Sequence, residues 1–174
     1  MQNIFTINNE QESMALRNKA VSLALPFDIK VINSIIAKIL KVIEAKGKVA
    51  GLAATQIGIN KRIMICNYTK NGNLEVLINP KYIPDQNTLE YGWEGCFSVP
   101  LTFAKVARWK TINIEYYTPK GNLIKKQLSG FHARIYQHEY DHLDGVLIID
   151  RGIEFKTVDS EDAYKSFLQT TITQ

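Results

Sequence analysis

Two histidines and a glutamate stand within the short segment QHEYDH, as His138, Glu139 and His142. On a helix, residues four apart share a face, so both imidazoles can reach one divalent cation while the glutamate flanks it. Metalloenzymes use this spacing to hold a metal and to place a general base beside it. The alternative is an ordinary charged helix whose histidines are hydrogen-bonded at its edge.

A catalytic metal site usually takes three protein ligands and keeps one position open for water. The remaining histidine, His132, precedes His138 on another helical face and is a poor third ligand. Cys96 is the other soft donor, in the segment WEGCFSVP, where a glycine and a proline predict a turn with the sulfur accessible. Cys96 could equally be a small buried side chain, which is the interpretation we favour for Cys66 in RIMICNY.

The helix that carries the histidines is predicted over residues 131–143, with Gly145 just beyond its end. A second helix is predicted to begin at the N-cap Asp28 and to end at Gly47. Its apolar residues recur every three or four positions: Ile29, Ile32, Ile36, Ile39, Leu40 and Ile43. Two further short helices are predicted, one within residues 14–25 and one from the cap Asp159 through Leu168.

Alternating apolar segments predict strands that pair as two hairpins, over residues 62–68 with 74–79 and 111–117 with 123–128. The first hairpin is expected to turn at residues 70–73, and a last short strand is expected at 146–149. Helices and antiparallel strands segregated in this way indicate an α+β fold. We expect antiparallel or mixed sheets around a central helix that carries the histidine motif.

The composition predicts a single domain over residues 1–174. The predicted elements place its core at about 28–150 and a C-terminal helix at about 159–170. The chain has 174 residues, of which 45% are hydrophobic, enough for one sizeable core. The net charge of +4 comes from scattered basic residues, which argues against nucleic acid as a direct substrate. The N-terminal residues do not resemble a secretory signal and no apolar run spans a membrane, so we expect a soluble, cytoplasmic protein.

Three segments in chain order resemble the motifs of the peptide deformylase family. They are VAGLAATQ at 49–56, EGCFS at 94–98 and QHEYDH at 137–142. The family forms are G-x-G-L-A-A-x-Q, E-G-C-L-S and Q-H-E-x-D-H, and the separations between motifs also match. The resemblance extends from about Asp28 to Ile149. It implies hydrolysis of the N-formyl group from the initiator methionine of nascent polypeptides, with release of formate.

The resemblance assigns a role to each matching residue of the reaction centre. Cys96, His138 and His142 would hold one divalent ion, and Glu139 would act as general base and then general acid for an activated water. The Gln56 amide and the Phe97 backbone N–H would stabilise the oxyanion. The family commonly works with iron, so we expect Fe²⁺, with Zn²⁺, Ni²⁺ or Co²⁺ in a purified sample.

Substrate binding is implied along the first motif and the helix. The segment around Gly51 is expected to form an edge strand that pairs with the peptide backbone. By family position, Arg134 would offer its aliphatic stem to a methionine pocket. The implied substrate-binding residues are Ala50, Gly51, Gly95, Phe131, Arg134 and Ile135.

Supporting residues and partners follow from the same resemblance. Glu94 is expected to pair with Arg108, Gln137 also matches a family position, and Asp141 is expected to accept a hydrogen bond from a ligand or a backbone group. The expected partners are N-formyl-Met nascent peptides and, transiently, the ribosome. The protein is expected to be a monomer without membrane contact.

Three positions outside the EGCFS motif depart from the family pattern. Val49 replaces the first motif glycine, where a positive φ would be strained. Lys48 stands where an acidic residue is common, and Phe103 stands where many members have arginine. The last two positions are expected to flank the peptide cleft and to alter handling of residues beyond methionine.

Two other functions fit the same motif. An endopeptidase would use the same helix, but the downstream third ligand of that pattern is missing. A divergent paralogue would keep the metal site and serve as a binding protein or act on another N-acyl peptide. An assay with formyl-Met peptides against internal peptides separates the endopeptidase. Metal-loaded protein that binds formyl-Met peptides without releasing formate would favour the paralogue.

Overall fold

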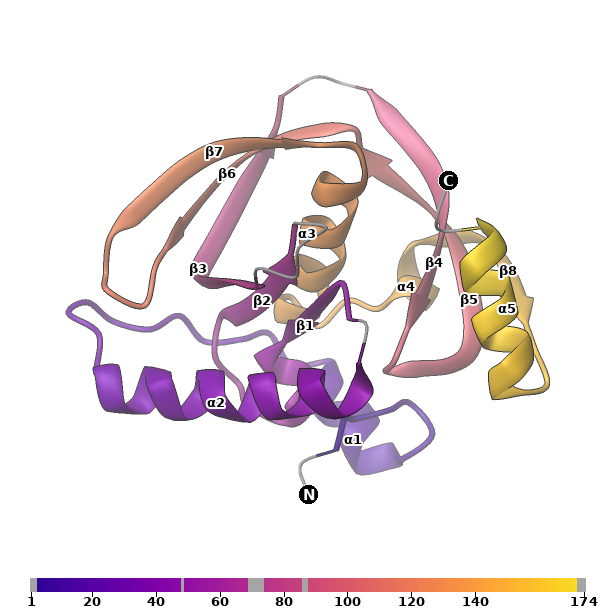
Figure 1. The fold of residues 1–174 in the computed structure, drawn as a ribbon, viewed down its shortest axis with the longest axis horizontal. Helices are drawn as coiled ribbons and strands as arrows, with labels where there is room; N and C mark the ends of the chain where they lie inside the picture. The colour runs from indigo at the N-terminus through magenta and orange to yellow at the C-terminus, as the bar shows by residue number, and fades with distance from the viewer. Residues whose placement is uncertain (1–2, 48, 69–73, 86–87, 172–174) are drawn as a thin grey trace.

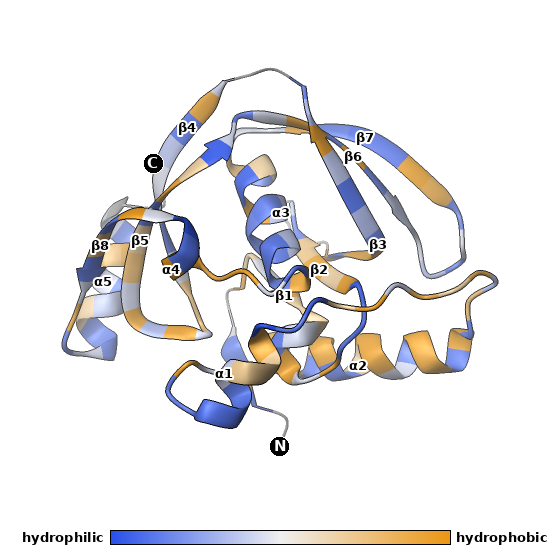
Figure 2. Cartoon of the chain, turned by 180° about the vertical axis from the view of Figure 1, so that it is seen from behind, coloured by the Kyte–Doolittle hydropathy of each residue, from blue (hydrophilic) through white to orange (hydrophobic). Residues whose placement is uncertain are grey.

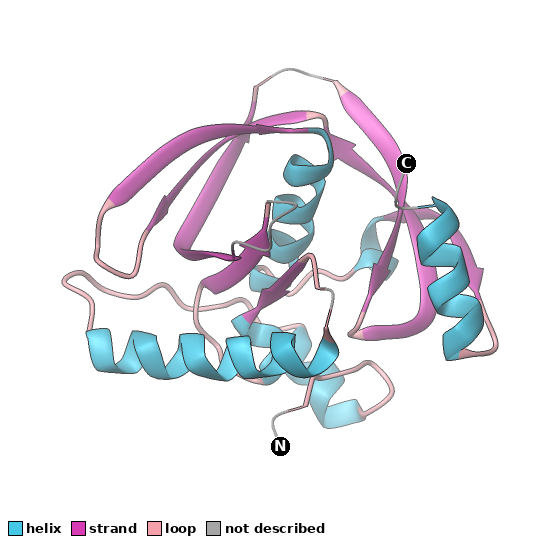
Figure 3. Cartoon of the chain, in the orientation of Figure 1, coloured by secondary structure: helices cyan, strands magenta, loops and turns pink. Residues whose placement is uncertain are grey.

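The computed structural model describes residues 3–47, 49–68, 74–85 and 88–171. Helices and strands form the α+β fold that the sequence predicts, with a central helix and two antiparallel sheets (Figures 1 and 3). The helices are α1 (Glu10–Leu16), α2 (Ile29–Lys46), the 3₁₀ turn η1 (Ala54–Ile57), α3 (Gly130–Leu143), α4 (Ile148–Arg151) and α5 (Glu161–Thr171). The strands are β1 (Gly51–Ala53), β2 (Ile63–Asn67), β3 (Leu74–Pro84), β4 (Leu89–Cys96), β5 (Val99–Trp109), β6 (Thr111–Tyr117), β7 (Leu123–Ser129) and β8 (Gly152–Thr157).

The larger sheet has five strands in the order β1-β2-β3-β6-β7. Both predicted hairpins are confirmed, since β2 pairs with β3 and β6 with β7 in antiparallel register. The turn expected at residues 70–73 lies outside the described residues. The short strand β1 pairs with β2 at the edge of this sheet, with Gly51 opposite Cys66. An open edge is therefore available beside the first motif.

The second sheet, β4-β5-β8, was largely missed by the sequence patterns. Glycines and glutamates interrupt the alternation of β4, which hides the strand, and β4 and β5 are joined by Phe97 and Ser98 alone. Gly95 and Pro100 thus lie within strands, and the expected turn is shorter than predicted. The strand expected at 146–149 is wrong: the Leu147 N–H bonds to Asp150 Oδ2 at 2.7 Å and starts the helical turn α4.

Helix α2 begins and ends where the sequence predicts. Asp28 Oδ1 accepts hydrogen bonds from the backbone N–H groups of residues 30 and 31, and Gly47 ends the helix with φ of +80°. The buried face is rotated around the helix from the one that the predicted apolar residues mark. Ile29 and Leu40 are exposed, whereas the core receives Ile32, Ile35, Ile39, Val42 and Ile43.

The two short terminal helices differ from their predictions. The helix expected within residues 14–25 is wrong for most of that range: α1 begins earlier, at Glu10, where the Asn9 side chain caps it by accepting from the Glu12 N–H at 3.0 Å. Beyond Leu16 the chain leaves the helix and forms a β-bridge at Val21. Helix α5 begins later than the expected cap Asp159, and Ser160 Oγ accepts from the Ala163 N–H at 3.2 Å instead.

Helix α3 lies between the two sheets and contacts strands of both, including β1, β2 and β5 (Figure 1). Figure 2 shows many hydrophilic residues on this interior helix, and Gln137, Glu139, Asp141 and His142 are buried there. Buried polar groups require partners or a function. The burial of these four polar side chains makes α3 the first place to look for a functional site.

No helix within the described residues is long and apolar enough to cross a membrane.

Candidate metal centre

The His-Glu-His motif and Cys96 meet at one point of the fold. Successive turns of α3 present His138 and His142, whose ring centroids lie 5.1 Å apart. Strand β4 ends at Cys96, whose sulfur lies 3.2 Å from Nε2 of His142. One donor atom from each of the three residues falls within 4.8 Å of the other two. His132 is exposed and packs against Tyr68, away from this cluster.

The cluster fits a small divalent cation. Ligand bonds of about 2.0–2.3 Å place the donor atoms around a tetrahedral ion about 3.5 Å apart, which the observed separations accommodate. Thiolate and imidazole donors suit Fe²⁺, Co²⁺, Ni²⁺ and Zn²⁺. The sulfur is less accessible than the sequence suggests, because Cys96 is 4% exposed. Cys66 is a buried side chain of β2, as expected.

Glu94 organises the charges behind the cluster. Its carboxylate accepts two hydrogen bonds from the Arg108 guanidinium at 2.9 Å, and a third from the Arg134 guanidinium at 2.7 Å. It also lies 2.9 Å from Nδ1 of His138, which leaves the other ring nitrogen to face the cluster. Burial alone would raise the pKa of Glu94, but Arg108 and His138 lower it well below its usual range.

The histidine pKa values move in opposite directions. Burial lowers the pKa of His138, but hydrogen bonds with Cys96 and Glu94 outweigh burial and raise it. Burial, together with the charges of His138 and Arg108, lowers the pKa of His142. The two imidazoles thus occupy electrostatically distinct places, with the carboxylate behind His138.

Arg108 pairs with Glu94, as the sequence analysis predicts, and also bonds to Asp141, which was not predicted. Asp141 is buried and accepts hydrogen bonds from Arg108 and from Arg151, the latter at 2.8 and 2.9 Å. Its partners are therefore two guanidinium groups, in place of the expected ligand or backbone donor. Gln137 bonds through its amide to the backbone N and O atoms of Trp109. These contacts fix α3 against β5.

Gln56 reaches the cluster from the 3₁₀ turn after β1. Its Oε1 accepts from the Ala53 N–H at 2.9 Å, and its Nε2 donates to Ser98 Oγ at 3.2 Å. The same nitrogen lies 3.8 Å from the Cys96 sulfur. With its oxygen held by the backbone, the amide directs N–H groups toward the cluster.

Glu139 lies between the cluster and β1. A Cβ atom on residue 51 would overlap the Glu139 side chain, so this crossing of strand and helix requires Gly51. Oε2 of Glu139 is buried and accepts no hydrogen bond within the described part of the chain. Burial raises the pKa of Glu139 to about 7, and the neighbouring His138 opposes this shift.

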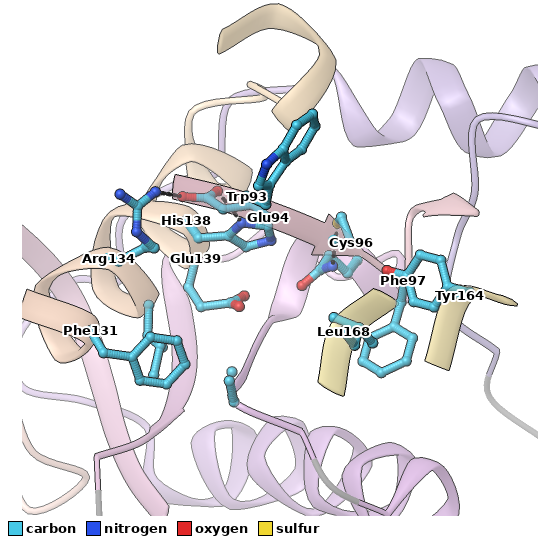
Figure 4. A pocket seen from close by; sticks show the side chains of 15 residues that line it. Trp93, Glu94, Cys96, Phe97, Phe131, Arg134, His138, Glu139, Tyr164 and Leu168 are labelled. Atoms are coloured by element: carbon cyan, nitrogen blue, oxygen red, sulfur yellow. Dashed lines mark hydrogen bonds and ion pairs between the residues drawn. The ribbon is translucent and has the colours of Figure 1, made fainter. Parts of the chain in front are cut away.

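A cavity of about 190 Å³ opens in front of Glu139. Figure 4 shows Phe131 and Arg134 on one side of it and Phe97, Tyr164 and Leu168 on the other. All six residues expected to bind substrate line this cavity: Ala50, Gly51, Gly95, Phe131, Arg134 and Ile135. Trp93, Tyr164 and Leu168 also line it and were not predicted: Trp93 lies just before the EGCFS motif, and no motif marks the C-terminal helix.

The three departures from the family pattern have different outcomes. Lys48 lies outside the described residues. Val49 is buried in the core, and it is not among the described residues with positive φ. Phe103 does not line the cavity: it is fully buried beneath α5, where its ring stacks on Tyr164. The expectation that Phe103 flanks the cleft is therefore wrong, because its side of the sheet is covered by the last helix.

The fold is α+β, and its candidate metal site combines two histidines of an HExxH helix with a cysteine from a strand. These features define the class of protein. The sequence profile of the polypeptide deformylase family matches residues 1–158. The chain belongs to the polypeptide deformylase family.

Relatives and solved structures agree with this family. The peptide deformylase of Thermotoga sp. (strain RQ2) is 43% identical over 101 residues, which span 58% of the chain and 60% of that relative. The crystal structure of peptide deformylase from Thermotoga maritima matches with a TM-score of 0.76 at 32% identity, over 88% of this chain and 99% of that one. A class I type b peptide deformylase from Acinetobacter baumannii with Met-Ala-Ser bound matches with a TM-score of 0.74 at 26% identity, over 87% and 99%.

Proposed function

We propose that the protein is a metal-dependent peptide deformylase, which removes the N-formyl group from the initiator methionine of new polypeptides and releases formate. The family and the fold support this activity. The observation that carries it is the position of Glu139, buried between the Cys/His/His cluster and an open cavity, with one carboxylate oxygen unpartnered within the described residues.

Cys96, His138 and His142 would hold the cation, which we propose is Fe²⁺ in the native protein. Zn²⁺, Ni²⁺ or Co²⁺ would replace it in a purified sample, since the same donors suit all four ions. When bound, the ion supplies Lewis-acid activation of the attacking water and of the formyl carbonyl. Glu94 would keep His138 in the orientation that points its free nitrogen to the ion.

Glu139 would move the proton. Its carboxylate takes a proton from the attacking water as the new C–O bond forms at the formyl carbon. It then delivers that proton to the methionine nitrogen as the C–N bond breaks, so the products are formate and a free amine. The formyl carbon carries hydrogen in place of a side chain, so little room is needed on that side.

Gln56 and Phe97 would stabilise the negative charge that develops on the carbonyl oxygen. The Gln56 amide is held by Ala53 and Ser98, so the remaining N–H, on the side of Cys96, is already oriented before the reaction. Phe97 follows Cys96 directly and lines the cavity, and its backbone N–H would be the second donor.

The peptide would bind along β1. This strand is an open edge beside the cavity, where a substrate backbone can pair in a sequence-independent way. The methionine side chain would enter between Phe131, Arg134 and Ile135. The Arg134 guanidinium turns away to Glu94 and to backbone oxygens, which leaves its aliphatic stem for the pocket. The Met-Ala-Ser tripeptide bound to the Acinetobacter relative supports this class of ligand.

We further propose that the protein acts in the cytoplasm. It would bind N-formyl-Met nascent peptides during their synthesis, with transient contact to the ribosome. The protein would act as a monomer, because the cavity, the cluster and the open strand edge all come from one chain.

Formate release from formyl-Met-Ala-Ser by anaerobically prepared, iron-loaded protein tests the function. We expect Glu139→Gln to keep its metal and to lower kcat by at least about 100-fold, because the proton carrier is lost. Glu154→Gln, which removes an exposed carboxylate paired with Lys105, is the control and should keep wild-type activity. Metal content is measured on the same samples.

Three outcomes would contradict the proposal. An active Glu139→Gln variant would remove Glu139 as the base. Cleavage of internal peptides without formate release would favour an endopeptidase. Tight binding of formyl-Met peptides by metal-loaded wild-type protein, without any formate, would favour a binding protein.

A further inference from the structure

The C-terminal helix α5 lies against the three-stranded sheet beside the metal centre (Figure 1). An aromatic cluster holds it there. The Phe103 ring of β5 stacks on Tyr164 with ring centroids 4.3 Å apart, and Phe167 lies 4.5 Å from the same ring. Phe167 also meets Trp93 edge-on at 5.6 Å. Stacked and edge-on contacts of this kind fix the helix in register with the sheet.

The stacking brings the Tyr164 hydroxyl to the end of β4. Gly95 pairs with Phe103 across the sheet and directly precedes Cys96. A Cβ atom on residue 95 would overlap the Tyr164 hydroxyl, so the phenol lies directly against the Gly95 backbone. Burial, followed by the nearby Cys96, raises the pKa of Tyr164, while a backbone hydrogen bond from Cys96 opposes that shift. Tyr164 therefore contacts the peptide that carries the ligand sulfur.

The neighbours of the Gly95–Cys96 peptide are held by side chains from other elements: Arg108 and Arg134 hold Glu94, and Gln56 holds Ser98. The peptide itself lies where the β4–β5 register shifts, and after Phe97 and Ser98 the chain has reversed into β5. A register irregularity disrupts the ladder locally and changes the direction of a side chain, so a tilt of this peptide would move the sulfur relative to His142. The phenol is placed to prevent this movement.

We propose that Tyr164 is a positioning residue for Cys96: through its hydroxyl, α5 fixes the Gly95–Cys96 peptide and directs the sulfur toward His138 and His142. The inference concerns the metal centre on which the proposed function rests. By this proposal α5 supports the metal centre, although none of its residues is a proposed metal ligand.

Cobalt binding tests this role without relying on turnover. We expect Tyr164→Ala to raise the Kd for Co²⁺ by about 10-fold or more, in the range found when residues that orient metal ligands are removed. The thiolate-to-cobalt absorption band should weaken or shift, because the sulfur is no longer held. Tyr164→Phe keeps the stacked ring but loses the hydroxyl, and we expect a smaller rise in Kd of the same sign.

Phe167→Ala is the matched control. It removes an aromatic ring from the same helix and the same cluster but leaves the hydroxyl against Gly95. We expect it to lower thermal stability while the Kd for Co²⁺ stays within about twofold of wild type. Folding of each variant is checked by circular dichroism and thermal unfolding before cobalt is added.

A folded Tyr164→Ala protein with wild-type Kd and absorption would overturn the proposal. So would an equal loss of affinity in Phe167→Ala, since helix docking alone would then explain the effect. The proposed function can fail separately. If the Tyr164 variants lose cobalt affinity as expected but the wild-type protein releases no formate, this inference holds and the proposed function is refuted.

Discussion

Glu94 is the residue on which the most charged contacts of the site converge. One carboxylate holds two guanidinium groups and one ring nitrogen of His138, and its side chain is 5% exposed. A buried charge of this kind is stable because every partner is present, and the removal of one member leaves the others uncompensated. Its function is thus both structural and orienting.

Glu94→Gln should therefore affect stability and metal binding together. The amide has the same shape but no charge, so Arg108 and Arg134 lose their counter-ion and His138 loses its acceptor. We expect the free energy of unfolding to fall by about 3–5 kcal/mol and the metal Kd to rise about 10–100-fold. Urea unfolding and metal titration measure the two effects.

Glu90→Gln is the control on the same strand. Glu90 pairs with Lys110 at 3.1 Å, and both side chains are about half exposed. A pair of this kind contributes about 0–1 kcal/mol, so the control should resemble wild type. If Glu94→Gln behaved like Glu90→Gln, the proposed role of the Glu94 carboxylate in orienting His138 would be wrong.

At the scale of elements, the crossing of β1 over α3 brings the first and third motifs together. Gly51 of β1 faces the Glu139 side chain without an intervening Cβ, and Thr55 Oγ1 donates to the His142 carbonyl at 3.0 Å. The edge strand and the Glu139 carboxylate, the proposed base, are therefore in direct contact. A substitution in β1 should therefore displace the Glu139 carboxylate more than it displaces the proposed metal ligands.

Gly51→Ala tests this contact. The backbone of residue 51 does not have positive φ, and the nearest obstacle to an alanine Cβ is the Glu139 side chain, which must move. We expect kcat to fall by about 100-fold, as for a displacement of about 1 Å in a reacting group. Metal content should stay near wild type because the three ligands are untouched. Wild-type turnover by a folded Gly51→Ala protein would show that Glu139 has room to move.

At the scale of the whole molecule, the cluster joins two parts of the fold. Cys96 belongs to the three-stranded sheet, whereas His138 and His142 lie on the helix that contacts the five-stranded sheet. A bound cation would connect them and would bind the folded state alone. Metal binding should therefore appear as a gain in global stability.

Free metal at 100 times its Kd should stabilise the protein by about 2.7 kcal/mol. For a domain of this size, we expect the Tm to rise by about 5–10 °C. Chelation should reverse the rise, and Cys96→Ser should weaken or abolish it. Calorimetry with and without a chelator measures the effect. A Tm that did not respond to metal in the wild-type protein would contradict a site shared between the two sheets.

The sequence predicted the local features well, since these depend on residues close together in the chain. The Asp28 cap, the two hairpins and the 131–143 helix follow from periodicity and capping, which act over a few residues. The α5 cap was placed at Asp159 when Ser160 makes the bond, an error of the kind expected at helix ends. Strand β4 was missed because glycines and glutamates interrupt its alternation, and pairing with the distant strand β5 along its whole length stabilises it.

The amino-acid sequence by itself determined that His138, Glu139 and His142 share one helical face, because helix geometry sets that spacing. Three ordered motifs then determined the family. The tertiary structure alone decided that Cys96 is buried beside those histidines, that Glu94 is shared between Arg108 and Arg134, and that Phe103 and Tyr164 bring the last helix to the site. Contacts between residues far apart in the chain depend on how the sheets and helices pack, and no local pattern encodes that packing.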